Sequence, residues 1–441
     1  MPSQTSFLCI RYRVARLRAD RRAFSSVAFA GSVLAVFGAV AMATDVGVWY
    51  VARRGAQNAA DAGATAAVMA LSLSGPHAGR AGGLDIASRN GFANTTGGRT
   101  TVAVNIPPST GALTADPTAV EVVVRQQQTM TAAALFLDAA PTVAGRTVGR
   151  LRESSNVCIL ALTGQLWAGG GTTVNTPDCV LASNRRSAPS IEIAGGSLDI
   201  TAFSLSAVAS CLNCDSSQVH LSERYREFQA PTEDPFRHLL AKALPRPASN
   251  CQNFNENSDP DPLPYELNGQ RLYCNMHVTG GRTVNLSPGT YYIWKGDFRI
   301  NGGSSVVCPT CTGDQGVAIV LTGDPGAIGN FTIGSNSYVR LRAARVARNP
   351  DYNGVLFYRD VRGGYGSTSS PSVTLNGGSN MSLTGGLYFP STHVRINGNA
   401  AVNTCSVIVA ASVEFSGNAQ VNGCGDTGTR VPRTRQVVVA E

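Results

Sequence analysis

The longest apolar stretch of the chain runs from Ala23 to Thr44 and contains 22 residues without a charged side chain. About 20 apolar residues are enough for a helix to cross the hydrocarbon core of a bilayer. The stretch therefore predicts a single transmembrane helix at residues 23–44. The following residues are rich in alanine and polar side chains, so we expect the helix to continue outside the membrane over residues 45–75.

The residues before the apolar stretch indicate its orientation. Residues 1–22 contain six arginines and one aspartate, and positively charged flanking segments stay on the cytoplasmic side. This pattern predicts a cytoplasmic basic tail and an extracytoplasmic remainder. A cleaved signal peptide is the alternative, because Ala41-Met42-Ala43 fits a small-x-small cleavage pattern. The apolar run exceeds the roughly 7–15 residues of a signal-peptide core, which favours a retained anchor.

Between residues 82 and 152 the pattern of hydrophobic and polar positions predicts a small α+β module. Two short helices are expected at Ala81–Phe92 and Thr131–Asp138. Segments rich in β-branched residues predict strands at Thr100–Ile106, Ala119–Arg125 and Thr142–Leu151.

Short apolar segments interrupted by glycine and asparagine recur over residues 157–425. Copies of this repeat begin at Ile193, Val278, Ile300, Ile333, Leu375, Ile396 and Phe415. The steps between these starts are 85, 22, 33, 42, 21 and 19 residues, and all but the 33 lie close to multiples of about 21. Short strands joined by Gly/Asn corners at a fixed period are typical of solenoids.

We therefore expect an all-β domain at 157–425 with the architecture of a right-handed parallel β-helix. An insertion is expected at about 215–270, and a C-terminal tail at 426–441. A β-sandwich built from hairpins is the alternative, because Asn-Gly pairs also form hairpin turns.

The cysteines indicate an oxidising compartment. Ten of the eleven follow the apolar stretch, whereas Cys9 precedes it. An even number of cysteines in an exported region predicts disulfide bonds, although sequence alone does not fix which pairs form. Pairing of neighbours gives Cys158–Cys179, Cys211–Cys214, Cys251–Cys274, Cys308–Cys311 and Cys405–Cys424. A zinc site made from the two Cys-x-x-Cys pairs is the alternative, and export favours disulfides over it.

The junction between the apolar stretch and the alanine-rich helix carries a specific pattern. An Asp-x-Gly step is followed by two arginines and by Gln-Asn-Ala-Ala-Asp-Ala at 57–62. Over residues 21–71 this pattern resembles the N-terminal region of the TadE/TadG-like proteins of Tad (Flp) pilus assembly, and that of TadG-related proteins in particular. The matching positions are Asp45, Gly47, Arg53, Gln57, Asn58, Ala60 and Asp61. Many TadG proteins also carry a von Willebrand factor A-type domain, but this sequence lacks its Asp-x-Ser-x-Ser metal motif.

The alanine-rich helix allows two interpretations. Ala56, Ala59, Ala60, Ala64 and Ala67 keep neighbouring positions small, which would let a partner helix approach closely. Alternatively, alanine only favours the helical conformation. Trp49 and Tyr50 are expected at the membrane–water interface, and Asp45 is expected to stabilise the outward helix as a cap or through its charge.

Charge and residue spacing argue against several functions. Most of the net charge of +8 lies in the basic tail, so the charge of the exported part is too weak to argue for binding of nucleic acid. We expect no metal site and no cofactor. Parallel β-helices also host polysaccharide-degrading enzymes, which need convergent carboxylates. The densest charged cluster, Asp351 and Asp360 with Arg348 and Arg359, is expected to be a solvated loop instead.

The pattern and the resemblance together predict a non-enzymatic structural protein of Tad (Flp) pilus assembly. It is expected in the bacterial inner membrane as a single-pass protein, with its bulk in the periplasm. The implied partners are other pilus-assembly membrane proteins or pilus subunits, and cell-wall polysaccharide is a further candidate. The alternatives are a carbohydrate-active enzyme and a secreted adhesin released after Ala43.

Overall fold

The computed structural model divides the chain into two compact units. Unit 1 comprises residues 1–151 and 437–441, and unit 2 comprises residues 152–436. The described residues are 21–94, 98–135, 137–244, 246, 251, 253–254, 270–334, 336–346, 350–363, 373–376, 380–397, 401–417, 420–422 and 429–440.

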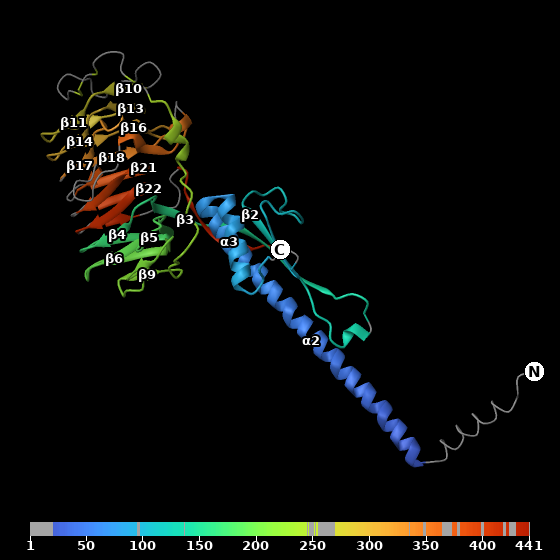
Figure 1. The fold of residues 1–441 in the computed structure, drawn as a ribbon. Coiled ribbons are helices and arrows are strands. Elements are labelled where there is room, and N and C mark those ends of the chain that lie inside the picture. Colours follow the sequence, from blue (N-terminus) through green and yellow to red (C-terminus); the bar gives the residue numbers. More distant parts are fainter. Residues whose placement is uncertain are drawn as a thin grey trace, which may run out of the picture. The chain divides into compact units, whose positions relative to one another are not determined.

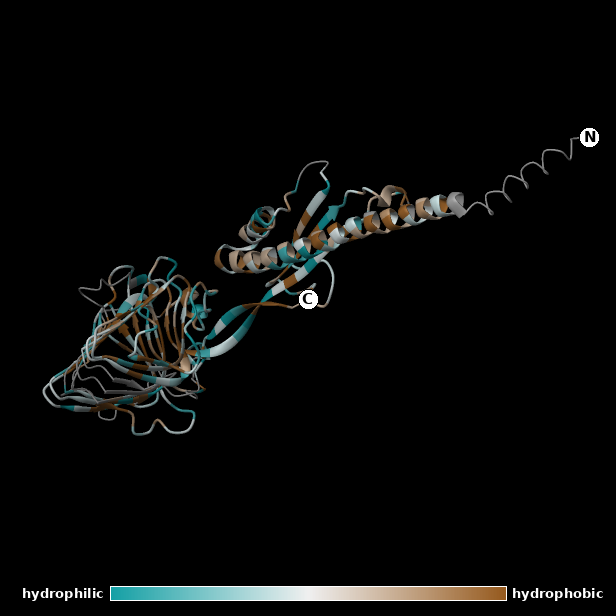
Figure 2. Cartoon of the chain, turned by 90° about the horizontal axis from the view of Figure 1, so that it is seen from below, coloured by the Kyte–Doolittle hydropathy of each residue, from teal (hydrophilic) through white to brown (hydrophobic). Residues whose placement is uncertain are grey.

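A single long helix, α2 (Arg21–Ser74), begins unit 1. Of the helices that the structure describes, this is the one long and apolar enough to cross a membrane, and its most apolar window is not buried. Figure 2 shows hydrophobic residues in brown along this part of the helix. The expected N-terminal apolar helix is therefore present, and it continues without a break into the folded part of unit 1.

The rest of unit 1 is a second helix and a small antiparallel sheet. Strand β2 pairs antiparallel with β1 on one side and with β3 on the other. The elements are α3 (Pro76–Arg89), β1 (Thr100–Asn105), β2 (Ala119–Gln127) and β3 (Thr142–Ala161). The helix expected at Thr131–Asp138 is wrong, because the segment forms one 3-10 turn, η1 (Ala133–Leu135).

Unit 2 is built from parallel strands, and from β10 to β18 each strand pairs with the third strand after it. In the first series β10 (Gln270–Tyr273), β13 (Gly289–Trp294), β16 (Val317–Thr322) and β19 (Val355–Arg359) are neighbours. The second series is β11 (Met276–Val278), β14 (Phe298–Ile300), β17 (Phe331–Ile333) and β20 (Val373–Leu375). The third is β12 (Thr283–Asn285), β15 (Ser305–Val307), β18 (Tyr338–Arg342) and β21 (Asn380–Asn397).

The direction of neighbouring strands distinguishes the two expected architectures. A sandwich of hairpins needs antiparallel neighbours. The strand ladders of unit 2 that the structure describes are parallel, as the labels β10, β13 and β16 in Figure 1 help to follow. The domain is therefore a large, mostly parallel β structure.

The glycine pairs of the repeat lie at the corners between successive short strands. Gly280 and Gly281 separate β11 from β12, and Gly302 and Gly303 separate β14 from β15. All four have positive φ angles, between 64° and 74°. Residues with a β-carbon rarely adopt this conformation, which explains why the repeat has glycine there.

The order of the strands in space differs from their order along the chain. Strand β22 (Ala401–Ser416), near the end of the chain, pairs with β3 and with β4 (Leu166–Gly169). Likewise β23 (Gln420–Asn422) pairs with β5 (Thr173–Ser183). The first strands continue away from this junction through β6 (Ile191–Ala194), β7 (Asp199–Ala207), β8 (Cys211–Leu212) and β9 (Val219–Leu221). The chain therefore enters unit 2 in the middle of the strand stack.

The segment that follows β9 covers one outer face of the sheet. Tyr292, Tyr358 and Tyr388 lie on neighbouring strands of the stack and are at most 2% exposed. They pack in one cluster with Phe236 and Leu239, the latter in the 3-10 turn η2 (Arg237–Ala241). The expected insertion thus includes a packed cover in addition to its residues outside the described ranges.

The C-terminal residues do not form the expected tail. They form β24 (Arg433–Val439), and Val437 packs against the core of unit 1. Ala440 N donates to Val148 O at 2.8 Å. The segment contains four β-branched residues, Thr434, Val437, Val438 and Val439, which favour a strand.

Candidate functional site

Two residues of the junction motif, Gln57 and Asp61, connect α2 to strand β3 by side-chain hydrogen bonds. Gln57 Nε2 donates to Arg146 O at 3.1 Å, and Arg146 N donates back to Gln57 Oε1 at 3.2 Å. Gln57 Nε2 also lies 2.9 Å from Asp61 Oδ1 and 2.9 Å from Thr147 Oγ1. Thr147 Oγ1 donates to Asp61 Oδ1. We call Gln57, Asp61, Arg146 and Thr147 the helix–strand clamp.

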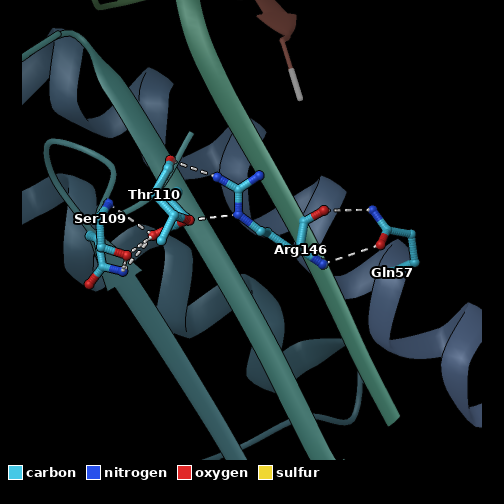
Figure 3. Close-up of polar contacts among 6 residues, drawn as sticks. Gln57, Ser109, Thr110 and Arg146 are labelled. Carbon is cyan, nitrogen blue, oxygen red and sulfur yellow. Dashed lines mark hydrogen bonds and ion pairs between the residues drawn. The ribbon is translucent and has the colours of Figure 1, made fainter. Parts of the chain in front are cut away.

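The clamp continues into a buried carboxylate on the neighbouring strand. Arg146 Nε donates to Glu121 Oε1 at 2.7 Å, and Glu121 is 1% exposed. Figure 3 shows Arg146 placed between Gln57 on one side and Thr110 on the other. Burial alone would raise the pKa of Glu121, but hydrogen bonds from Ser109, Asn105 and Thr110 outweigh it and hold the pKa well below its usual value.

A third motif residue holds the loop that contains η1. Asp45 accepts hydrogen bonds from Ala133 N at 2.7 Å, from Thr131 Oγ1 at 2.8 Å and from Thr131 N at 3.2 Å. Trp49 Nε1 donates to Thr129 O at 3.1 Å. Asp45 therefore acts on backbone groups 86–88 residues away rather than as a cap of its own helix.

The alanine face of α2 packs inside unit 1. Ala56, Ala59, Ala60, Ala64 and Ala67 are all 0% exposed and share one cluster with β2 valines. A β-carbon on Gly145 would lie 2.5 Å from backbone atoms of Ala56 and Gln57, so glycine is required where β3 meets the helix. These alanines contact the chain's own sheet, so the interpretation as a docking face for a partner helix is wrong for them.

The comparison with family models decides what this helix resembles. Residues 24–70 match the model of the putative Flp pilus-assembly TadE/G-like family. The resemblance expected from the junction motif is thereby confirmed for this segment. No match was found among curated proteins or among solved structures.

The TadE/G-like segment contains two kinds of motif residue. Asp45, Gln57, Ala60 and Asp61 are bonded or packed inside unit 1. Gly47, Arg53 and Asn58, in contrast, lie on the exposed side of α2. A β-carbon on Gly47 would meet nothing within 4 Å. The first group accounts for how the segment folds, and the second remains available for contacts with other molecules.

The two Cys-x-x-Cys pairs are disulfide-bonded. Cys211–Cys214 and Cys308–Cys311 form disulfides, as do Cys158–Cys179 and Cys251–Cys274, with Cα–Cα distances of 5.2–5.8 Å. The zinc alternative is therefore wrong, because a cysteine in a disulfide offers no thiolate to a metal. Cys424 lies outside the described residues, so the pair Cys405–Cys424 stays a prediction. No group of three or more potential metal ligands occurs in the part of the chain that the structure describes.

The acidic residues considered for catalysis belong to separate ion pairs. Asp351 Oδ2 lies 2.6 Å from Lys242 Nζ. Asp360 pairs with Arg362 and accepts from Thr322 Oγ1 at 3.1 Å. Arg359 is 2% exposed, not solvated, and donates to Gly329 O, Ile328 O and Thr392 Oγ1. Arg348 lies outside the described residues.

A pocket of about 510 Å³ opens in unit 2 where β22 meets β4, and no sequence pattern predicts it. Its wall includes buried His393, whose Nδ1 lies 2.7 Å from Ser412 Oγ and whose Nε2 lies 2.9 Å from Glu414 Oε2. Arg395 Nε lies 2.9 Å from Glu414 Oε1. Burial lowers the pKa of His393, against the opposing effect of Glu414. Because these residues come from strands that pair only in the fold, no local sequence signal reveals them.

The pocket also contains a half-buried indole. Trp167 pairs with Glu414 on one side and with Glu192 on the other. A β-carbon on Gly169 would lie 2.6 Å from Trp167 Cζ2, so the ring lies over this glycine along the strand. The arrangement gives a flat aromatic surface bordered by carboxylates.

Proposed function

We propose that the protein is a membrane-anchored, non-catalytic structural component of Tad (Flp) pilus assembly. The observation that carries this proposal is the match of residues 24–70 to the TadE/G-like family. The matched segment includes the exposed apolar part of α2 and the clamped part inside unit 1. The segment thus unites a membrane anchor and the foundation of a folded unit in one helix.

The same proposal places the N-terminus in the cytoplasm and both units in the periplasm. The arginine-rich residues 1–22 support this orientation. The disulfides of unit 2 support it independently, because such bonds persist in oxidising compartments such as the bacterial periplasm. We infer anchoring in the inner membrane by a retained helix.

For unit 2 we propose a right-handed β-helix-like solenoid. The pairing of each strand from β10 to β18 with the third strand after it supports this architecture, as do the glycine corners. A stack of this kind presents long, flat outer faces, which suit a structural role.

The exposed motif residues are the proposed contact site for other pilus-assembly membrane proteins or pilus subunits. Gly47, Arg53 and Asn58 match the family without taking part in the clamp. Their position on α2, directly outside the apolar stretch, suits contact with the helices of neighbouring membrane proteins. Loss of this contact would leave the folded units intact.

A deletion of the gene tests the proposal. Cells lacking the protein are expected to lose Tad surface filaments, and a plasmid copy of the wild-type gene is expected to restore them. Unchanged filament numbers in the deletion strain would overturn the pilus assignment.

The pocket at Trp167 favours cell-wall polysaccharide as a second partner. An indole ring offers a face that packs against the C–H groups of a sugar, and Glu414 and Arg185 in the same pocket suit hydroxyl groups. Binding of the purified protein to insoluble cell-wall sacculi is expected to fall at least fivefold for Trp167→Ala. Phe228→Ala, which removes an exposed aromatic ring outside this pocket, is the control. Equal binding of both variants would exclude this partner site.

A further inference from the structure

The loop that contains η1 exposes large apolar side chains. Leu135 is 82% exposed and Leu137 is 43% exposed. Soluble surfaces rarely present neighbouring large apolar side chains without a binding role. Figure 1 shows the loop extending from the sheet of unit 1 along α2, toward the N-terminal end of the helix.

The level of this loop along α2 is fixed by hydrogen bonds. Asp45 is 5% exposed and bonds Thr131 and Ala133, and Trp49 bonds Thr129. Two side chains of α2 therefore hold the loop beside residues 45–49 of the helix. Ala133, whose backbone N–H donates to Asp45, lies only two residues before Leu135 in the chain.

Asp45 also marks the end of the apolar stretch. The 22 uncharged residues before it form about 33 Å of helix, close to the roughly 30 Å of a bilayer core. Val36 in this stretch is 61% exposed, and Val46 and Val48 beyond Asp45 are each 57% exposed. Leu135 and Leu137 are thus exposed on a loop that is bonded to α2 at this end of the apolar stretch.

We propose that residues 129–135 and Leu137 form a second membrane contact, with Leu135 and Leu137 inserted into the interfacial region of the outer leaflet of that membrane. This rests on the proposed anchoring by α2. The occupant of the apolar surface is lipid, because the loop is held at the boundary of the bilayer-spanning stretch. Apolar side chains at this depth bind the boundary between headgroups and acyl chains.

A second contact has a structural consequence. A lone helix can tilt and rotate in a bilayer, and interfacial anchors restrict both motions. The loop and α2 would fix the orientation of unit 1 relative to the membrane surface. Asp45, a residue of the family motif, acts here as the positioning residue of the loop.

Site-specific fluorescence in proteoliposomes tests the proposal. In a Cys9→Ser background, Leu135→Cys is labelled with an environment-sensitive NBD group under non-reducing conditions, and the full-length protein is reconstituted in phosphatidylethanolamine/phosphatidylglycerol vesicles. Quenching by lipids carrying a doxyl group on the acyl chain reports contact with the bilayer. Val36→Cys is the positive control in the anchor stretch.

Leu84→Cys is the matched negative control. Leu84 is 39% exposed, but it lies on α3 beside Gly83, which packs against Ala67 of α2. Ala67 is 22 residues beyond Asp45, or about 33 Å along the helix. The label at position 84 should therefore remain outside the bilayer.

The expected result is strong quenching at positions 36 and 135, and at least threefold weaker quenching at position 84. Adding Asp45→Ala should reduce the quenching at position 135 at least twofold and leave position 36 unchanged. Quenching at position 36 without quenching at position 135 would overturn the loop contact but not the anchoring by α2. The same result is expected if the natural occupant of the loop is a partner protein rather than lipid. Absence of quenching at 36 would overturn the anchoring as well.

Discussion

The side-chain amide of Gln57 and the main chain of Arg146 bond each other in both directions. The two distances are 3.1 Å and 3.2 Å, so Gln57 presents to β3 the donor and acceptor that a neighbouring strand would present. A single side chain thereby joins a helix to the open side of a sheet. The TadE/G-like segment uses this bond to turn the end of an anchor helix into part of a folded unit.

Gln57→Ala should therefore destabilise unit 1. Removal of the amide leaves polar groups of Arg146, Thr147 and Asp61 without this partner, which costs about 1–3 kcal/mol. Urea unfolding of the full-length protein in detergent micelles, combined with hydrogen exchange of the β3 amides, measures the loss. Asn58→Ala, an exposed neighbour, should change the unfolding free energy by less than about 0.5 kcal/mol. Equal effects of the two variants would contradict the clamp.

Gly145→Ala, on β3, should destabilise unit 1 more than a glycine-to-alanine change within α2. Its β-carbon would lie 2.5 Å from backbone atoms of Ala56, and backbone cannot move aside cheaply. We expect a loss of about 1–3 kcal/mol from overpacking.

Gly47→Ala is the natural control for that change, because its β-carbon meets nothing within 4 Å. Alanine in a helix interior is favoured over glycine by about 0.5–1 kcal/mol, so this variant should be as stable as the wild type or more so. A destabilised Gly47→Ala together with an unaffected Gly145→Ala would show that the helix packs differently.

The stability of unit 1 should depend on the protonation of Glu121. Its folded pKa lies below its ordinary value of 4.5. A carboxyl group of this kind stabilises the fold above its unfolded pKa, and the stabilisation is lost as the pH falls toward the folded pKa. Unfolding free energies of wild type should thus decline as the pH falls below about 4.5. Glu121→Gln should show a smaller decline, whereas Asp85→Asn, at an exposed carboxylate, should behave as the wild type.

The disulfides of unit 2 should contribute unequally to its free energy of unfolding. Cys158–Cys179 closes a loop with a sequence separation of 21 residues, whereas Cys211–Cys214 has a separation of 3. Loop-closure entropy predicts stabilisation of about 3 kcal/mol for the longer loop and about 1.5 kcal/mol for the shorter one. Chemical unfolding of the two double Cys→Ser variants, followed by the fluorescence of Trp167 and Trp294, measures the difference. A larger loss for the short loop would contradict this account.

Local sequence signals predict the glycine corners and the parallel strands of unit 2 but not the order of the strands in the stack. The glycine corners at Gly280 and Gly302 follow from the repeat, because a positive φ angle leaves a local signature. The pairing of Ile408 with Ile159 has no such signature. Parallel pairing between distant segments depends on the whole stack, so the entry of the chain into the middle of the stack emerges only from the structure.

In unit 1 the motif was recognised, but the roles of its residues were not. Asp45 was expected to stabilise its own helix, whereas it binds Ala133 and Thr131 far along the chain. The small-residue face of α2 allowed an interpretation as a docking face for a partner helix, but its alanines pack on β2 instead. A small-residue face looks the same in sequence whether the approaching element comes from the same chain or from another one.

The most direct test of the pilus-assembly role is the number of surface filaments on cells in which Arg53→Glu replaces the wild-type protein. The account predicts few filaments, with wild-type levels of folded, membrane-inserted protein, because Arg53 is an exposed motif residue outside the clamp. Arg89→Glu reverses an exposed charge on α3 and should keep wild-type filament numbers. Wild-type filament numbers with Arg53→Glu would contradict the assignment of the exposed motif residues, and wild-type numbers in the deletion strain would contradict the pilus-assembly role itself.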